Sequence, residues 1–105
     1  MIRVKFFYTD DFNIKGFELK GHADYDEFGY DIVCSAVTSN TIAVINSLDT
    51  LQKVSFDKVE AKEGYISAVV CDSDIEKSQL LLEHLKLAIE QIKKEYPKNI
   101  KIFEK

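Results

Sequence analysis

Two patterns of strand, turn and strand, each followed by a long helical pattern, constrain the fold of this chain most. Apolar residues alternate from Ile2 to Tyr8, which predicts a strand. Thr9 to Asp11 reads as a turn, and Phe12 to Lys20 as a second strand whose side-chain period slips near Gly16, where a bulge is expected. From Ile32 to about Leu51, apolar and small residues recur at helical spacing. The first half therefore predicts a hairpin and then a helix.

The second half repeats this arrangement. Val54 to Ala61 and Tyr65 to Cys71 predict another hairpin, and a long amphipathic helix is expected from about Asp74 to Tyr96. Ser73 to Glu76 has the spacing of a capping box. The stripe expected to be buried consists of Leu81, Leu85, Ala88, Ile89 and Ile92. Ile100 to Phe103 would add a last strand.

The order ββαββαβ predicts an α+β fold, with a largely antiparallel sheet packed against two helices. The 105 residues suit one domain, residues 1–105, and 46% hydrophobic residues suffice for a core without disulfides or metals. We find no Ser/Gly-rich linker and no internal repeat. The fold class by itself predicts no function.

The N-terminal residues lack the apolar run of a signal peptide, and we expect no stretch that approaches the roughly 20 apolar residues of a membrane span. A cytoplasmic location without membrane contact is therefore the default expectation. In a reducing compartment, Cys34 and Cys71 are expected to be free thiols, because their spacing matches no redox or zinc motif.

The net charge of −4 argues against direct binding of nucleic acid, which favours clustered Lys and Arg. The acidic excess is uneven, because four carboxylates fall between His22 and Cys34 without an intervening Lys or Arg: Asp24, Asp26, Glu27 and Asp31. This segment is either a solvated loop or a source of negative electrostatic potential that attracts a cationic chain. Both interpretations stay open.

His22 and Cys34 stand twelve residues apart, the first just after a predicted strand and the second just inside a predicted helix. A neighbouring imidazole and a helix N-terminus are the two common means of activating a thiol. With Asp31 as N-cap, Cys34 would occupy about the third helical position, where free N–H groups favour a negative sulfur and an oxyanion. Asp31 is either that cap or the group that orients His22.

Other interpretations compete with catalysis. Cys34 alone would suit a small core residue and His22 a surface residue, and a zinc site of His22, Cys34 and a carboxylate lacks a recognised spacing. Cys71, at the end of a strand, is expected to be buried. His84 is expected near the polar boundary of the second helix, without a surrounding motif.

The segments Gly21 to Ala23 (GHA) and Tyr30 to Ser39 (YDIVCSAVTS) together resemble the signature of the ribosomal-processing cysteine protease family, Prp. The likeness extends over the whole chain in length and in the order of elements. Ser35 and Thr38 stand where Ala and Ser are more usual, which leaves a Cys-His dyad intact but puts fine substrate preference in doubt.

The resemblance implies a cysteine endopeptidase that removes a short N-terminal extension from large-subunit ribosomal protein number twenty-seven, cutting after two aromatic residues and before a small one. It implies Cys34 as nucleophile, His22 as base and Asp31 as a third member, without a cofactor. It also implies a homodimer and a mobile loop, here about Ala23 to Tyr30. Phe28 and Tyr30 either line a pocket for aromatic side chains or cover the core.

A function of a different class remains open. The chain could be a non-catalytic ribosome-assembly or binding module whose acidic loop grips a basic ribosomal protein. Such a module would still bind its partner after Cys34→Ala and would never release a product.

Overall fold

The computed structural model describes residues 1–21 and 30–104, so His22 and the segment up to residue 29 lie outside the described residues. The elements are β1 (Ile2–Tyr8), β2 (Ile14–Lys20), α1 (Tyr30–Thr50), β3 (Phe56–Lys62), β4 (Tyr65–Val70), the short 3-10 helix η1 (Asp72–Asp74), α2 (Ile75–Glu95) and β5 (Ile100–Glu104). The predicted order ββαββαβ is confirmed, with η1 added before the second helix.

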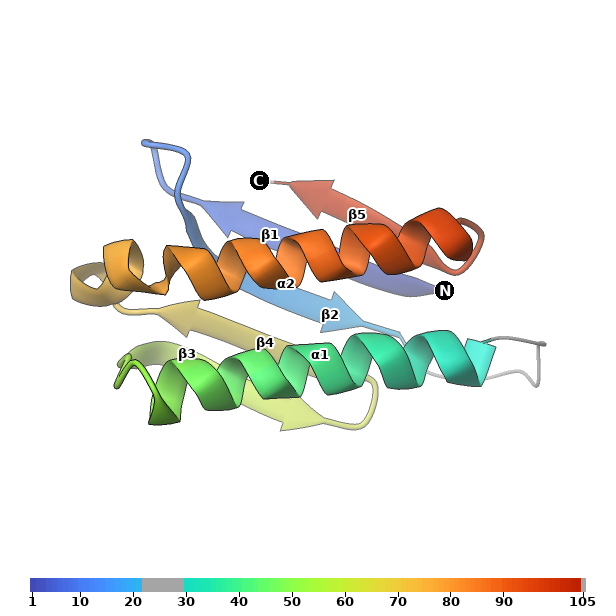
Figure 1. The fold of residues 1–105 in the computed structure, drawn as a ribbon, viewed down its shortest axis with the longest axis horizontal. Helices are drawn as coiled ribbons and strands as arrows, with labels where there is room; N and C mark the ends of the chain where they lie inside the picture. Colours follow the sequence, from blue (N-terminus) through green and yellow to red (C-terminus); the bar gives the residue numbers. More distant parts are fainter. Residues whose placement is uncertain (22–29, 105) are drawn as a thin grey trace.

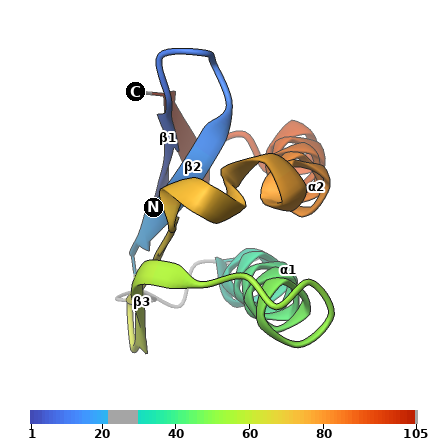
Figure 2. The same ribbon diagram turned by 90° about the vertical axis from the view of Figure 1, so that its left-hand side faces the viewer.

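The five strands form one sheet in the order β3-β4-β2-β1-β5. Neighbouring strands are antiparallel except β1 and β5, which run parallel. Both helices pack on the same side of the sheet, and no described helix or strand covers its other side, called the open side below (Figure 1, Figure 2). This arrangement confirms the predicted α+β class with a largely antiparallel sheet.

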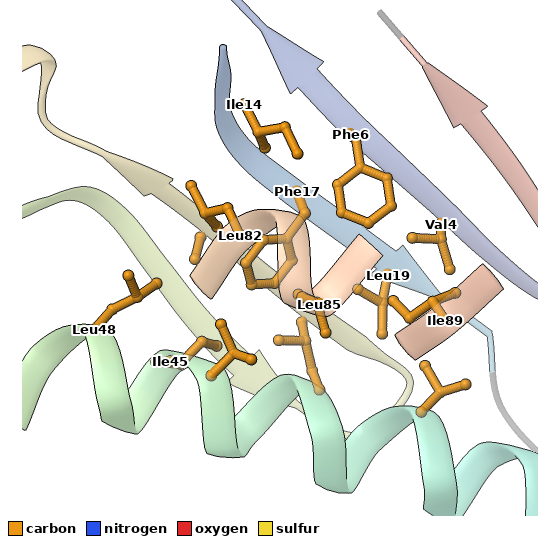
Figure 3. Packing of buried hydrophobic residues seen from close by; sticks show 14 of the residues in the cluster. Val4, Phe6, Ile14, Phe17, Leu19, Ile45, Leu48, Leu82, Leu85 and Ile89 are labelled. Atoms are coloured by element: carbon orange, nitrogen blue, oxygen red, sulfur yellow. The ribbon is translucent and has the colours of Figure 1, made fainter. Parts of the chain in front are cut away.

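The core lies between the sheet and the two helices. Alternate residues of β1 and β2 face it, with Val4 opposite Leu19 and Phe6 opposite Phe17. Leu85 of α2 packs into the same cluster, which Figure 3 shows in close view. Because side chains alternate between the faces of a strand, the residues between these positions point to the open side.

The predicted bulge in the first hairpin is confirmed. Phe7 lies opposite Gly16 and Tyr8 opposite Ile14, so Lys15 is the additional residue. The close approach of β4 also explains why position 16 is a glycine. A Cβ there would lie 2.5 Å from the backbone oxygen of Ala68. Any larger residue would therefore push these two strands apart.

Helix α1 corrects one expectation about membranes. Its segment Ile32–Thr50 is long and apolar enough to cross a bilayer by length and composition, although no such stretch was expected. In the fold, Val37, Val44 and Leu48 of this helix belong to the buried core. The core helix of a folded protein passes the same test, and α1 packs against α2 and contributes these residues to the core.

The start of α2 also differs from the prediction. Ser73 lies within η1, and Asp74 is the N-cap of α2 without a capping hydrogen bond from its side chain, so the capping box is wrong. The carboxylate of Asp74 instead accepts a hydrogen bond from the backbone N–H of Ser55 at 2.7 Å. It thereby ties the helix start to the segment before β3.

The buried stripe of α2 is largely as predicted. Leu85 and Ile89 are fully buried, and Leu82 joins them although the prediction omitted it. The other predicted members are only partly buried, namely Leu81, Ala88 and Ile92.

Lys86 of α2 joins this helix to the end of β5 through an ion pair. Its Nζ lies 2.7 Å from Oε1 of Glu104 and donates a hydrogen bond to the Tyr8 hydroxyl at 2.8 Å. These contacts raise the pKa of Lys86 and, through the same ammonium, lower the pKa of Glu104. The edge strand is thus held against the helix layer by charge as well as by packing.

Candidate active site

Cys34 lies one turn inside α1, and the nearby helix residues Val33 and Val37 are buried in the core. The helix begins at Tyr30, so Asp31 is its second residue and the N-cap prediction for Asp31 is wrong. Cys34 is accordingly the fifth helical residue, where about the third was expected. Helix boundaries read from sequence commonly shift by one or two residues, because the pattern of apolar residues does not mark the first turn.

The new position changes which backbone groups are available to the sulfur. Only the first N–H groups of a helix lack an intrahelical partner, so the N–H of Cys34 itself is not among them. A helical Cα–Cβ bond leans toward the N-terminus, which directs the Cys34 side chain over the first turn of α1. The thiol therefore still lies near the helix end whose first N–H groups have no partner within the helix.

Cys34 is half-buried and lines a pocket of about 250 Å³. On the helix side the pocket is bounded by Cys34, Val37 and Thr38, which share one face of α1. Its other walls come from the sheet and the β3–β4 turn: Ile2, Leu19, Lys20, Gly21, Lys62, Glu63, Gly64, Tyr65 and Ile66. The end of β2, the start of α1 and the β3–β4 turn all lie at one end of the molecule (Figure 1).

Gly21 forms part of this pocket and precedes His22 in the sequence. Its φ of +143° is one that side-chain-bearing residues rarely adopt, and a Cβ there would lie 2.6 Å from the backbone oxygen of Met1. The Gly21 N–H donates to the backbone oxygen of Gly64 at 3.1 Å. The chain therefore leaves β2 at a fixed point on the pocket wall, and His22 itself lies beyond the part of the chain that the structure describes.

Tyr65 stands at the rim of the pocket among basic side chains. Its hydroxyl accepts a hydrogen bond from Nζ of Lys58 at 3.0 Å and donates one to Oε2 of Glu18 at 3.2 Å. The ammonium groups of Lys20 and Lys62 lie 5.9 and 5.5 Å from the ring centroid. The hydrogen bond to Tyr65 is the largest reason that the pKa of Lys58 is raised.

The other candidate residues lie elsewhere. Cys71 was expected to be buried, but it is only partly so, and its thiol donates a hydrogen bond to Oδ1 of Asp57 at 3.1 Å. This hydrogen bond, followed by burial and the nearby carboxylates, raises the pKa of Cys71. His84 is exposed on α2. Within residues 1–21 and 30–104, no group of three His, Cys, Asp or Glu side chains could hold a metal ion.

Sequence reasoning missed most of the pocket wall. Ile2, Tyr65 and Ile66 meet Cys34 only because β1, β2 and β4 pair side by side, with Leu19 opposite Ile66 and Lys20 opposite Tyr65. A pattern of local periodicity does not say which strands pair. The hairpin turn at Gly64 was visible in the sequence, but its approach to Gly21 was not.

The comparisons with known proteins agree over nearly the full length of the chain. The family model described as cysteine protease Prp matches residues 1–101. The ribosomal processing cysteine protease Prp of Bacillus subtilis is 30% identical over 109 residues, covering 97% of this chain and 96% of that protein. The protein of the same name from Staphylococcus aureus is 26% identical over 103 residues, covering 97% of each.

Solved structures give the same result for the fold. The crystal structure of the S. aureus protease in complex with a substrate peptide matches with a TM-score of 0.90 at 25% identity, covering 100% of both chains. The same protease with a covalently linked product peptide matches with a TM-score of 0.85 at 26% identity. Sequence and fold therefore agree that this chain belongs to the cysteine protease Prp family.

Proposed function

We propose that the protein is a cysteine endopeptidase that removes the N-terminal extension of the precursor of large-subunit ribosomal protein number twenty-seven. One observation carries the proposal. The thiol-bearing residue Cys34 and Gly21, the residue directly before His22, line the same pocket. Helix α1, which bears Cys34, and the end of β2, which leads to His22 in the sequence, therefore meet at this pocket.

In the proposed mechanism, the Cys34 sulfur attacks the carbonyl carbon of the scissile peptide bond. His22 takes the thiol proton and returns it to the leaving amine, so the new N-terminus departs and a thioester remains on Cys34. His22 then takes a proton from water, whose oxygen attacks the thioester carbon. The C–S bond breaks, the extension leaves as a carboxylic acid, and His22 returns its proton to the Cys34 sulfur. Free N–H groups at the start of α1 would receive the oxyanion in both steps.

The pocket suits the side chain that precedes the cut. At about 250 Å³ it is smaller than the roughly 300 Å³ at which ligand pockets typically begin, so it fits a single side chain better than a larger ligand. Its walls include the apolar residues Leu19, Val37 and Ile66. An aromatic residue just before the scissile bond would fill this space. Contacts by Phe28 or Tyr30 remain a prediction, as does the attraction of a basic substrate by the acidic segment.

The test is cleavage of a peptide that spans the extension and the following residues, followed by mass spectrometry under reducing conditions. The native protein should make a single cut after the aromatic pair. Cys34→Ala should abolish it, and His22→Ala should slow it by about 10²–10⁴-fold, the usual contribution of a general base. Cys71→Ala and His84→Ala are matched controls that should cut at the native rate.

Intact peptide with the native protein would contradict the proposal. If the peptide or the precursor still bound to the native protein and to Cys34→Ala alike, the result would favour the non-catalytic assembly module. Equal loss of cleavage in the Cys71→Ala control would show that folding, and not the dyad, was affected.

Asp31 can be tested separately as the residue that orients His22. Asp31→Asn removes the charge and keeps the size of the side chain, so an orienting role predicts a lower kcat with little change in KM or in thermal stability. A fall in stability without a change in kcat would assign the side chain to the helix start alone. The homodimer and the cytoplasmic location likewise remain predictions, the first open to sedimentation analysis.

A further inference from the structure

A row of basic side chains crosses the open face of the sheet at the end where the candidate site lies. Strand register places five residues side by side in this row, in the order Lys101, Arg3, Lys20, Tyr65 and Lys62. Their neighbours along the strands, such as Ile2, Leu19 and Ile66, are buried on the helix side. Since side chains alternate, the row itself faces away from the helices.

The half of this face formed by β1 and β5 combines cations with aromatic rings. Its five positions hold Arg3, Lys5 and Phe7 on β1 and Lys101 and Phe103 on β5, so none of the five is acidic. Phe103 lies opposite Lys5, and the Lys101 ammonium lies 5.2 Å from the Phe103 ring centroid. Both phenylalanines are partly exposed on the side of the sheet opposite α1 and α2 (Figure 2).

The charge of this face is opposite to that of the whole chain. Leaving out the two bulge residues Lys15 and Asp57, the register places six cations on the open side of the described strands, namely Arg3, Lys5, Lys20, Lys58, Lys62 and Lys101, against the two carboxylates Glu18 and Glu60. The face therefore carries a net charge of +4, whereas the full chain carries −4. The expectation that this chain avoids nucleic acid rested on the net charge, which does not show how charge is distributed.

Charge complementarity selects the class of partner. A second copy docked through the same face would bring two cationic surfaces together, and a basic ribosomal protein would be repelled in the same way. An anionic partner would be attracted. Flat rings beside Lys and Arg on an open sheet are the arrangement by which proteins stack exposed bases while holding the phosphates.

We propose that the open face of the sheet binds single-stranded RNA, with Arg3, Lys5 and Lys101 holding phosphates and Phe103 stacking a base. The row reaches the candidate site, because Lys20, Lys62 and Tyr65 also line its pocket. Arg3, Lys20, Glu60, Lys62 and Tyr65 further line a shallow depression beside it. An RNA strand on this face would pass the mouth of the pocket.

The proposal is tested by fluorescence anisotropy of a labelled oligouridine of about ten nucleotides, titrated with the native protein at several KCl concentrations. With three to four phosphate contacts, the logarithm of the binding constant should fall with the logarithm of salt concentration at a slope of about −2 to −3. Arg3→Glu combined with Lys101→Glu should weaken binding by about tenfold or more at roughly 50 mM KCl and flatten this slope. The milder pair Arg3→Gln and Lys101→Gln should act in the same direction.

Two control variants distinguish the effect of residues on this face from an effect of net charge and from the loss of an apolar side chain. Lys53→Glu combined with Lys94→Glu changes the net charge by the same amount away from the row, and it should leave binding within about twofold of the native protein. Phe103→Leu keeps an apolar side chain but removes the ring, and it should weaken binding by about fivefold.

These experiments test the RNA-binding proposal separately from the proposed proteolysis. Cys34→Ala should bind the oligouridine as tightly as the native protein, because the face contains no residue of the proposed dyad. Absence of saturable binding at roughly 50 mM KCl, or equal weakening by the Lys53 and Lys94 control pair, would overturn the proposal. Competition by polyglutamate as effective as by unlabelled RNA would also overturn it and would assign the face to an acidic protein.

Discussion

Gly21 is the residue whose backbone most directly determines where the candidate site forms. Its φ of +143° and the 2.6 Å that would separate a Cβ from the Met1 oxygen leave no room for a side chain. Gly21→Ala should therefore lower the free energy of unfolding by about 1–3 kcal/mol, the usual range for such backbone strain. It should also reduce peptide cleavage by displacing the chain that leads to His22.

Thermal unfolding and the cleavage assay measure both effects. Gly64→Asn is the control for stability alone, because Asn tolerates a left-handed conformation such as the φ of +74° at that turn, whereas Gly64 also lines the pocket. If Gly21→Ala kept native stability and native activity, the backbone conformation at position 21 would not be constrained as described.

Cys71 gives a prediction about pH at the residue scale. Its hydrogen bond to Asp57 stabilises the protonated thiol and raises the pKa of Cys71, so less thiolate is present at any given pH than in a free cysteine. The rate at which iodoacetamide alkylates Cys71 should therefore rise with pH along a curve that lies at higher pH than that of a free cysteine. Asp57→Asn should shift this curve to lower pH.

Peptide mapping of the alkylated protein over a pH series gives the rate at each cysteine. An unchanged Cys71 profile in Asp57→Asn would mean that the carboxylate does not hold the thiol in solution. Cys34 in the same samples serves as the internal comparison, since its labelling should not respond to a substitution at position 57.

At the scale of elements, α2 stabilises the fold through one face only. Leu85 is fully buried, whereas Leu80 on the same helix is 79% exposed. Leu85→Ala should cost about 2–5 kcal/mol of unfolding free energy, because it removes buried surface and leaves a cavity. Leu80→Ala should change stability by less than about 0.5 kcal/mol.

Chemical denaturation of both variants checks this pair. Similar losses for Leu80→Ala and Leu85→Ala would mean that the outer face of α2 is covered in solution.

Which elements form was largely predictable, and their exact ends were not. Alternation and helical spacing are local properties, so both hairpins, both helices and a bulge near Gly16 followed from the sequence, whereas the register places the additional residue at Lys15. The capping box failed because Ser73 lies inside η1 and Asp74 is the N-cap, whose carboxylate bonds to Ser55, a partner 19 positions away. Cys71 was misplaced for a related reason, since the strand ends before it and leaves its thiol beside Asp57.

At the scale of the whole molecule, strand pairing determines the pocket wall and the basic face, which could not be predicted from the sequence. The parallel contact of β5 with β1 and the contact of β2 with β4 both join segments far apart in the chain. These pairings bring Tyr65 to the pocket of Cys34 and gather the basic residues on one face. The chemistry proposed for the site is a prediction from the motif, whereas the wall of the pocket and the charge of the open face follow only from the register.

The most direct test of the central claim is intact-mass spectrometry of the protein mixed with its substrate peptide and quenched in acid during a single turnover. The account predicts a thioester whose added mass equals the N-terminal fragment, mapped to Cys34, present in Cys71→Ala and absent in Cys34→Ala. Cleavage by Cys34→Ala at the native rate, or an adduct on another residue, would contradict it.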